Sequence, residues 1–139
     1  MPRVEGYILR IVGEELVDHV FDMAIYYTNL NRKWSSGQVI LFVHKLEFGD
    51  AFIGYGVIER ILEKDELCDQ ERNDCERGGW KMAIEFKYVR KLERPLLVKE
   101  TFLKDSKLRG RFFHGLQLDR VQVESLLKQA GVSWFHQKS

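Results

Sequence analysis

An almost unbroken apolar run, QVILFVHK, occupies residues 38–45 and constrains the fold more than any other segment. Its length and β-branched content predict a strand buried on both faces. A turn follows at residues 47–50, and residues 51–62 have the composition of a second, long strand. We expect the two strands to pair as a hairpin, with Gly54 and Gly56 leaving room for close approach of another backbone or a ligand.

Three further segments have strand character. Residues 3–12 combine β-branched and aromatic side chains, and residues 80–92 alternate apolar and polar side chains. We expect the second of these strands to end before Pro95 and residues 96–103 to form a weaker strand. Residues 29–37 are rich in Asn, Ser and Gly, which predicts a loop.

Two segments are predicted to be helices. In residues 14–27 the apolar side chains recur at three- and four-residue spacing, the period of an amphipathic helix. Residues 119–130 form the second predicted helix, with Asp119 as the N-cap and Gln122 as its capping-box partner. Gly131 is placed to end this helix in the left-handed conformation.

Charge is balanced over the whole chain and uneven along it. The 22 Lys and Arg nearly equal the 21 Asp and Glu, so net charge predicts neither a DNA-coating protein nor an acidic chaperone. Residues 59–77 hold eight acidic and four basic side chains, whereas residues 81–120 hold eleven basic and five acidic ones. We expect a dipolar molecule, with residues 63–79 as a long polar loop between strands.

Cysteine content and hydropathy limit the remaining possibilities. Cys68 and Cys75 have no CxxC spacing and no neighbouring histidine, so we predict no metal site and no cofactor. No apolar run approaches the ~20 residues of a membrane span, and no signal-peptide pattern opens the chain. The sequence therefore predicts a cytoplasmic protein, with residues 1–139 as a single domain.

The order of these elements predicts the fold class. Short turns link consecutive strands, and only two main helices are expected, so a doubly wound parallel sheet is disfavoured. We predict an α+β fold in which a curved, mainly antiparallel sheet of about five to six strands coils into a small pseudobarrel.

Four segments in this order resemble the PUA-like superfamily, and within it the EVE domain and a related uncharacterised archaeal family. They are KWSSG at 33–37, IGYGVIERI at 53–61, WKMAIEF at 80–86 and RFFHG at 111–115. The resemblance implies a domain that binds nucleic acid, often by admitting one modified or flipped base to an aromatic-lined pocket. The chain departs from the EVE pattern in its acidic insertion and its poorly matching start.

The candidate site consists of aromatic and basic side chains in or beside these four segments. A base could stack on Trp34, serine hydroxyls could bond its edge, and the arginines of the 109–115 loop could contact phosphates. The alternatives are that Trp34 seals the end of the barrel and that Tyr55 is an ordinary strand residue; Trp80 is interpreted as a core residue. The candidate site residues are Lys33, Trp34, Ser35, Ser36, Tyr55, Arg109, Arg111, Phe112 and His114.

The chain contains no P-loop, no Gly-x-Ser-x-Gly and no HExxH motif, so the usual parts of phosphoryl-transfer, serine-hydrolase and zinc-hydrolase chemistry are missing. The hypothesis is therefore a non-catalytic domain that binds RNA or a modified base in nucleic acid. Two alternatives stay open: an enzyme acting on a small nucleoside-like substrate, and a module whose acidic residues 59–77 dock a basic protein partner.

Overall fold

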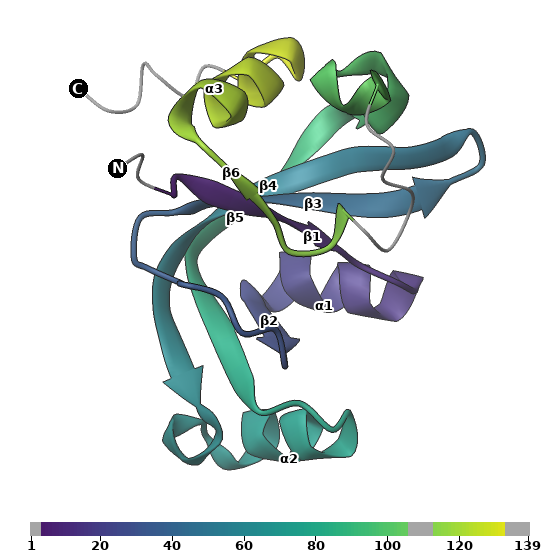
Figure 1. The fold of residues 1–139 in the computed structure, drawn as a ribbon. Coiled ribbons are helices and arrows are strands. Elements are labelled where there is room, and N and C mark those ends of the chain that lie inside the picture. The colour runs from purple at the N-terminus through teal and green to yellow at the C-terminus, as the bar shows by residue number, and fades with distance from the viewer. Residues whose placement is uncertain (1–3, 106–112, 133–139) are drawn as a thin grey trace.

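The computed structural model of the chain describes residues 4–105 and 113–132, which form one curled sheet with helices on both sides (Figure 1). The strands are β1 (Gly6–Arg10), β2 (Ile25–Thr28), β3 (Val39–Leu46), β4 (Gly49–Glu63), β5 (Met82–Leu97) and β6 (Leu116–Leu118). The helices are α1 (Glu14–Met23), α2 (Asp69–Arg77) and α3 (Arg120–Gln129).

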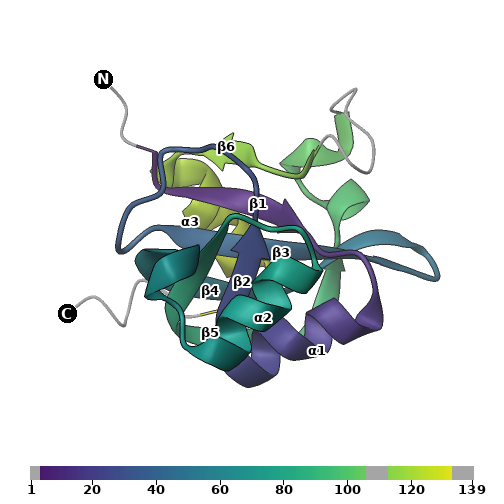
Figure 2. The same ribbon diagram turned by 90° about the horizontal axis from the view of Figure 1, so that it is seen from below.

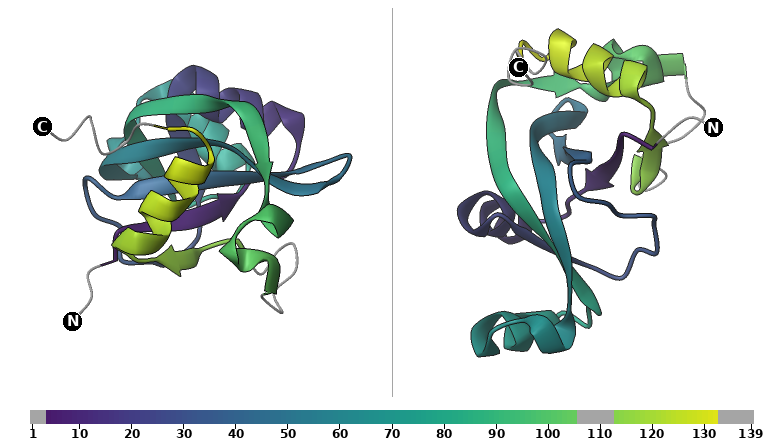
Figure 3. Two further views of the ribbon diagram at one scale, coloured as in Figure 1. Left: turned by 90° about the horizontal axis from the view of Figure 1, so that it is seen from above. Right: turned by 90° about the vertical axis from the view of Figure 1, so that its left-hand side faces the viewer.

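The strand order across the sheet is β2-β5-β4-β3-β1-β6. β1 and β3 pair in parallel, and the other neighbouring strands pair antiparallel. The long strands β4 and β5 curve strongly and carry α2 at their far end (Figure 3, right). The predicted α+β class with a curled, mainly antiparallel sheet is confirmed, with a third helix added.

Alternation along the strands divides the core between the two faces of the sheet. Ile8 and Leu41 face the cluster beneath α3, whereas their neighbours Tyr7 and Ile40 face the cluster beneath α1. Figure 3 (left) shows α3 lying across the sheet, and Figure 2 shows α1 and α2 in front of its other side. A third cluster, which includes Tyr27 and Cys75, lies next to α2.

The predicted hairpin is confirmed, because β3 and β4 pair from Val39↔Val57 to Leu46↔Gly49. Gly54 makes room for another backbone, as expected, and for a helix: a Cβ there would lie 2.5 Å from the Arg90 carbonyl oxygen on β5 and 2.5 Å from the ring of Phe21 on α1.

The expected loop at residues 63–79 is wrong. A short 3-10 turn at Lys64–Glu66 and the helix α2 fill it. Leu67 and Cys75 are buried among the third cluster, and these two side chains hold the segment against the sheet. Only two side chains of this mostly polar segment reach the core, so its sequence shows no apolar period that would predict a helix.

Two element ends also differ from the prediction. β5 continues through Pro95 to Leu97, because a register shift between Phe52 and Gly54 releases residues 92–95 from the ladder. Proline is tolerated at such a bulge since no ladder hydrogen bond is lost there. The helix predicted for residues 14–27 ends early: Ala24 adopts a left-handed conformation at φ 54°, and β2 begins at the next residue.

Helix α3 matches its prediction closely. The Asp119 side chain accepts from the Gln122 backbone N–H at 2.8 Å, and the Gln122 side chain accepts from the Asp119 backbone N–H at 3.0 Å. Gly131 follows the helix at φ 82°, as expected. Leu126 and Leu127 bury the inner face of the helix against the sheet.

Candidate functional site

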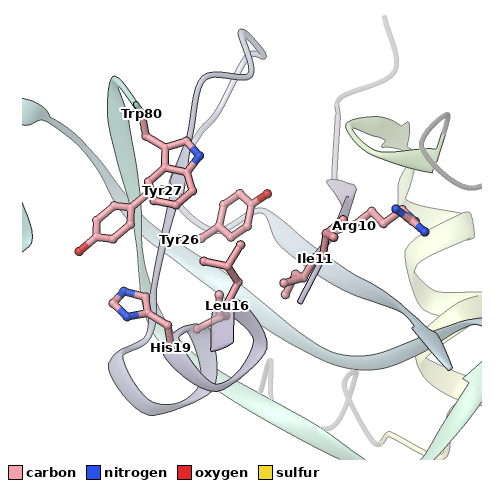
Figure 4. A pocket seen from close by; sticks show the side chains of 9 residues that line it. Arg10, Ile11, Leu16, His19, Tyr26, Tyr27 and Trp80 are labelled. Atoms are coloured by element: carbon pink, nitrogen blue, oxygen red, sulfur yellow. The ribbon is translucent and has the colours of Figure 1, made fainter. Parts of the chain in front are cut away.

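An aromatic-walled cavity of about 160 Å³ opens between the first half of α1, the strand β2 and the end of β1 (Figure 4). Tyr26 and Tyr27 form its middle, and Trp80 closes one side. Its lining residues are Arg10, Ile11, Val12, Leu16, His19, Val20, Tyr26, Tyr27 and Trp80.

Local chain geometry brings these rings together. The left-handed turn at Ala24 ends α1 and sends the chain back as β2, which places Tyr26 and Tyr27 beside the helix. After α2, the backbone N–H of Trp80 donates to the Cys75 carbonyl at 2.9 Å. The Cys75 thiol donates to the Trp80 carbonyl at 3.3 Å. With its backbone held in this way, Trp80 stacks on Tyr27 with ring centroids 5.5 Å apart and planes 26° apart.

Three buried polar atoms that belong to residues lining the cavity have no hydrogen-bond partner within residues 4–105 and 113–132. They are Arg10 Nε, His19 Nε2 and the Tyr27 hydroxyl. Leaving a buried donor or acceptor unpaired costs roughly 1–3 kcal/mol, so native structures rarely keep several together. The Arg10 guanidinium points away from the cavity (Figure 4), and its Nη2 lies 3.6 Å from Asp50 Oδ1, so the atoms of His19 and Tyr27 remain as the candidate ligand contacts.

Both tyrosine hydroxyls are neutral at physiological pH. Burial raises the pKa of Tyr26 to about 12. Burial, followed by the nearby carboxylates of Asp74 and Glu71, raises the pKa of Tyr27 to about 12. Each hydroxyl can therefore donate one hydrogen bond and accept others.

His114 is also neutral and has a defined tautomer. Burial, then the positive charges of Arg32 and Arg10, lower its pKa. Its Nδ1 accepts from the backbone N–H of Arg10 at 2.9 Å, so the proton of the neutral ring is on Nε2. Arg32 reaches the same region, since its Nε donates to the Gly115 carbonyl at 3.0 Å.

The cavity continues into two open hollows that share Tyr27 and Trp80 with it. The α2 hollow, about 390 Å³, lies between α1 and α2 and is lined also by Glu15, Leu16, His19, Asp74, Arg77 and Gly78. The β2 hollow, about 330 Å³, is lined also by Tyr26, Thr28, Asn29, Leu30 and His114. Together they form one groove with the enclosed cavity in the middle.

The structure separates the two aromatic rings that the sequence analysis placed in one cleft. Trp34 packs on the α1 side of the sheet, with its ring edge-on to Tyr7 at 4.8 Å and its indole N–H donating to the Leu30 carbonyl. Tyr55 is 4% exposed and belongs to the cluster beneath α3 on the opposite face. Trp34 and Tyr55 therefore do not face a common cleft.

Of the predicted site residues that the structure describes, His114 is the one that lines the groove. Lys33, Ser35 and Ser36 are exposed on the loop that also carries Arg32. The remaining predicted residues, Arg109, Arg111 and Phe112, lie outside the described residues.

Sequence reasoning missed most of the groove. Trp80, interpreted as a core residue, is half-buried and forms a wall of the cavity. Tyr26 and Tyr27 fall within the helix predicted for residues 14–27, and Arg10 falls within the strand predicted for residues 3–12, so none of the three was a candidate site residue. The adjacent tyrosines were the available signal, because aromatic side chains at neighbouring positions do not fit one helix face.

Two absences characterise the described part of the chain. No group of three or more His, Cys, Asp or Glu side chains there is arranged to hold a metal ion. No helix among these residues is both long and apolar enough to cross a membrane.

The sequence matches no family model and no curated protein, whereas the fold is similar to several solved structures. The ASCH protein from Zymomonas mobilis has 13% identity and a TM-score of 0.63, over 89% of this chain and 94% of that chain. The Mmi1 YTH domain has 14% identity and a TM-score of 0.57, over 95% of this chain and 90% of that chain.

A second YTH domain, from the MRB1 protein of Zygosaccharomyces rouxii, was solved in complex with N6-methyladenosine RNA. It has 14% identity and a TM-score of 0.54, over 89% of this chain and 84% of that chain. ASCH and YTH domains have PUA-like folds, so the architecture of this chain is PUA-like.

Proposed function

We propose that this PUA-like domain binds single-stranded nucleic acid, and RNA in the first place, by taking one unstacked base into the cavity beside Trp80. The observation that carries the proposal is an aromatic wall beside two buried polar atoms, His19 Nε2 and the Tyr27 hydroxyl, that have no partner in the described residues. Single-strand recognition uses this combination: a ring face for stacking and fixed polar groups for the edges of the base.

The size of the cavity suits one aromatic ring. A protein cavity of roughly 150 Å³ accommodates benzene. The space of about 160 Å³ beside Tyr26, Tyr27 and Trp80 is comparable, and the adjoining hollows offer room for the parts of a nucleotide beyond that ring.

Arg32 and the neutral His114 mark one end of the groove, where we place the phosphates, whereas the Arg10 guanidinium is paired with Asp50 at 3.6 Å. Arg10 and His114 are joined by a backbone hydrogen bond, and Arg32 reaches the carbonyl of the residue after His114. Arginine presents several donors to phosphate oxygens, and the His114 Nε2–H adds a neutral donor. Lys33, next to Arg32, is exposed and stays a predicted nucleic-acid contact, and Arg109 and Arg111 stay predicted phosphate contacts.

Two tryptophans provide the test: Trp80, which lines the cavity, and Trp34, on which the sequence analysis expected a base to stack. Trp80→Ala should weaken binding of a short fluorescent RNA roughly 5- to 100-fold, because stacking on an aromatic side chain contributes ~1–3 kcal/mol per base. Trp34→Ala is the matched control: it removes the same ring type from a position outside the groove. Fluorescence anisotropy measures both, after circular dichroism has shown that each variant is folded.

Either of two results would overturn the proposal. The first is wild-type protein that binds no single-stranded RNA or DNA. The second is Trp34→Ala losing affinity while Trp80→Ala keeps it, which would return the site to the 33–37 loop. Binding of a mononucleotide with no gain from flanking nucleotides would favour a small-molecule site instead.

A further inference from the structure

The groove that carries the proposed function has opposite electrostatic character at its two ends. Figure 4 shows Arg10 at one end of the cavity, with His19 and the Tyr27 hydroxyl at the other. The pKa of His114, beside Arg10, is lowered in part by two arginines, whereas the pKa of Tyr27 is raised in part by two carboxylates. Asp50 compensates Arg10 at a distance of 3.6 Å, so Arg32 carries the positive charge of one end, and the carboxylates beside Tyr27 make the other end negative.

The negative end is the α2 hollow. Its lining includes the carboxylates of Glu15 and Asp74 and the guanidinium of Arg77, together with the side chains of His19 and Tyr27. Arg77 compensates only loosely, because its Nη2 is 4.0 Å from Asp74 Oδ1 and its side chain is 77% exposed.

Asp74 keeps acceptor capacity at this end. Gln70 donates to its Oδ1 at 3.2 Å, and the Arg77 contact involves the same oxygen. A carboxylate can only accept hydrogen bonds, while the Tyr27 hydroxyl can both donate and accept. Tyr27 is only 5% exposed, yet its hydroxyl has no partner in the described residues, so it has hydrogen-bonding capacity to offer a ligand.

Resting on the proposed function, we propose that the cavity selects a base with an exocyclic amino group, adenine or cytosine, over the matching keto base. The phosphates lie toward His114 and Arg32, and the amino edge of the base points into the α2 hollow toward Asp74 and Tyr27.

Hydrogen-bond complementarity gives the physical reason. An amino group supplies two N–H donors to a region rich in acceptors, and carboxylates accept from such groups on bases. The adjacent ring nitrogen of adenine or cytosine can accept from Tyr27 or His19. A keto oxygen in the same place would face the Asp74 carboxylate, acceptor against acceptor, after both had lost water.

Adenine and inosine, which differ in this edge, test the inference. The probe is a fluorescent ribose-phosphate strand with abasic units around one central base, so that only that base can enter the cavity. The wild-type protein should bind the adenine strand with ~10-fold or higher affinity than the inosine strand. This ratio lies within the discrimination that a good contact to a base edge provides.

Asp74→Asn should abolish or invert this preference, because an amide can donate to the keto oxygen. Asp69→Asn is the matched control: it removes the same charge from the same helix, at a side chain that is 98% exposed. Asp69→Asn should keep the wild-type ratio, and thermal melting checks that both variants are folded.

The outcomes separate this inference from the function on which it rests. Equal affinity for adenine and inosine strands in the wild type would overturn the base preference and leave single-base binding intact. An unchanged ratio in Asp74→Asn, or an equal loss in Asp69→Asn, would overturn the role of Asp74. No binding of either strand, nor of ordinary RNA and DNA, would overturn the proposed function itself.

Discussion

At the scale of single residues, the His114 side chain lines the groove and is hydrogen-bonded to the backbone of β1. Its Nδ1 accepts from the Arg10 backbone N–H, a contact that requires an unprotonated nitrogen. Burial, Arg32 and Arg10 all disfavour the charged ring and lower its pKa below 6.5. Protonation would therefore cost both the hydrogen bond and the placement of Arg10.

Because the folded-state pKa of His114 is depressed, its contribution to stability is fully present above ~6.5, the unfolded value, and is lost as pH falls through the folded value. The free energy of unfolding of the wild type should decrease from pH 7.5 to pH 5. His114→Asn keeps an acceptor and removes the titration, so its decrease should be smaller. Urea unfolding at both pH values measures the difference. A variant that loses as much stability as the wild type would contradict this assignment.

At the scale of elements, α3 is stabilised by its own ends as well as by the sheet. The reciprocal hydrogen bonds between Asp119 and Gln122 satisfy backbone donors at its first turn. Val123, Leu126 and Leu127 bury its inner face. Since the helix covers one whole core cluster, losing its cap should lower the stability of the domain and leave the groove on the other face unchanged.

Asp119→Ala should reduce the free energy of unfolding by about 1 kcal/mol, the usual cost of removing an N-cap. Val121→Ala, at a side chain that is 74% exposed on the same helix, should change it by less than ~0.5 kcal/mol. Chemical denaturation measures both. RNA affinity should stay at the wild-type level in each variant, and a loss of affinity in Asp119→Ala would mean that α3 takes part in binding.

At the scale of the whole molecule, the net charge is near zero, but the fold places acidic and basic side chains in different regions. The acidic helix α2 lies at the far end of the β4–β5 arm (Figure 1), while exposed basic residues occur on the later part of β5, among them Lys87, Arg90, Lys91 and Arg94. Long-range attraction of a polyanion depends on such local potentials.

Nucleic-acid affinity should therefore fall steeply with salt, since bound phosphates release counterions. Arg32→Gln keeps a donor for the Gly115 carbonyl and removes the charge, so the slope of log affinity against log salt should become shallower by roughly 1. Arg120→Gln is the control, because Arg120 pairs with Glu124 on α3. A flat salt profile in the wild type, or equal changes in both variants, would argue against phosphates near Arg32.

The sequence alone was sufficient where the signal is local. Composition predicted β4, alternation predicted the first part of β5, a continuous apolar run predicted β3, and the cap residues predicted both ends of α3. These features depend on neighbours within a few positions, whose conformational preferences act before any tertiary contact forms. The joint order of such segments also indicated the PUA-like architecture, although no finding supports the narrower EVE assignment.

Only the tertiary structure decided the rest. Ile25–Thr28 form a strand because they pair with residues 82–85 of β5, and β1 and β3 run parallel because the chain crosses over through α1 and β2. The cavity takes its walls from four segments, so no window of sequence contains it. Trp80 lines this cavity, whereas Trp34 packs against the core. Their burial depends on residues that are distant in the sequence, so local composition could not predict it.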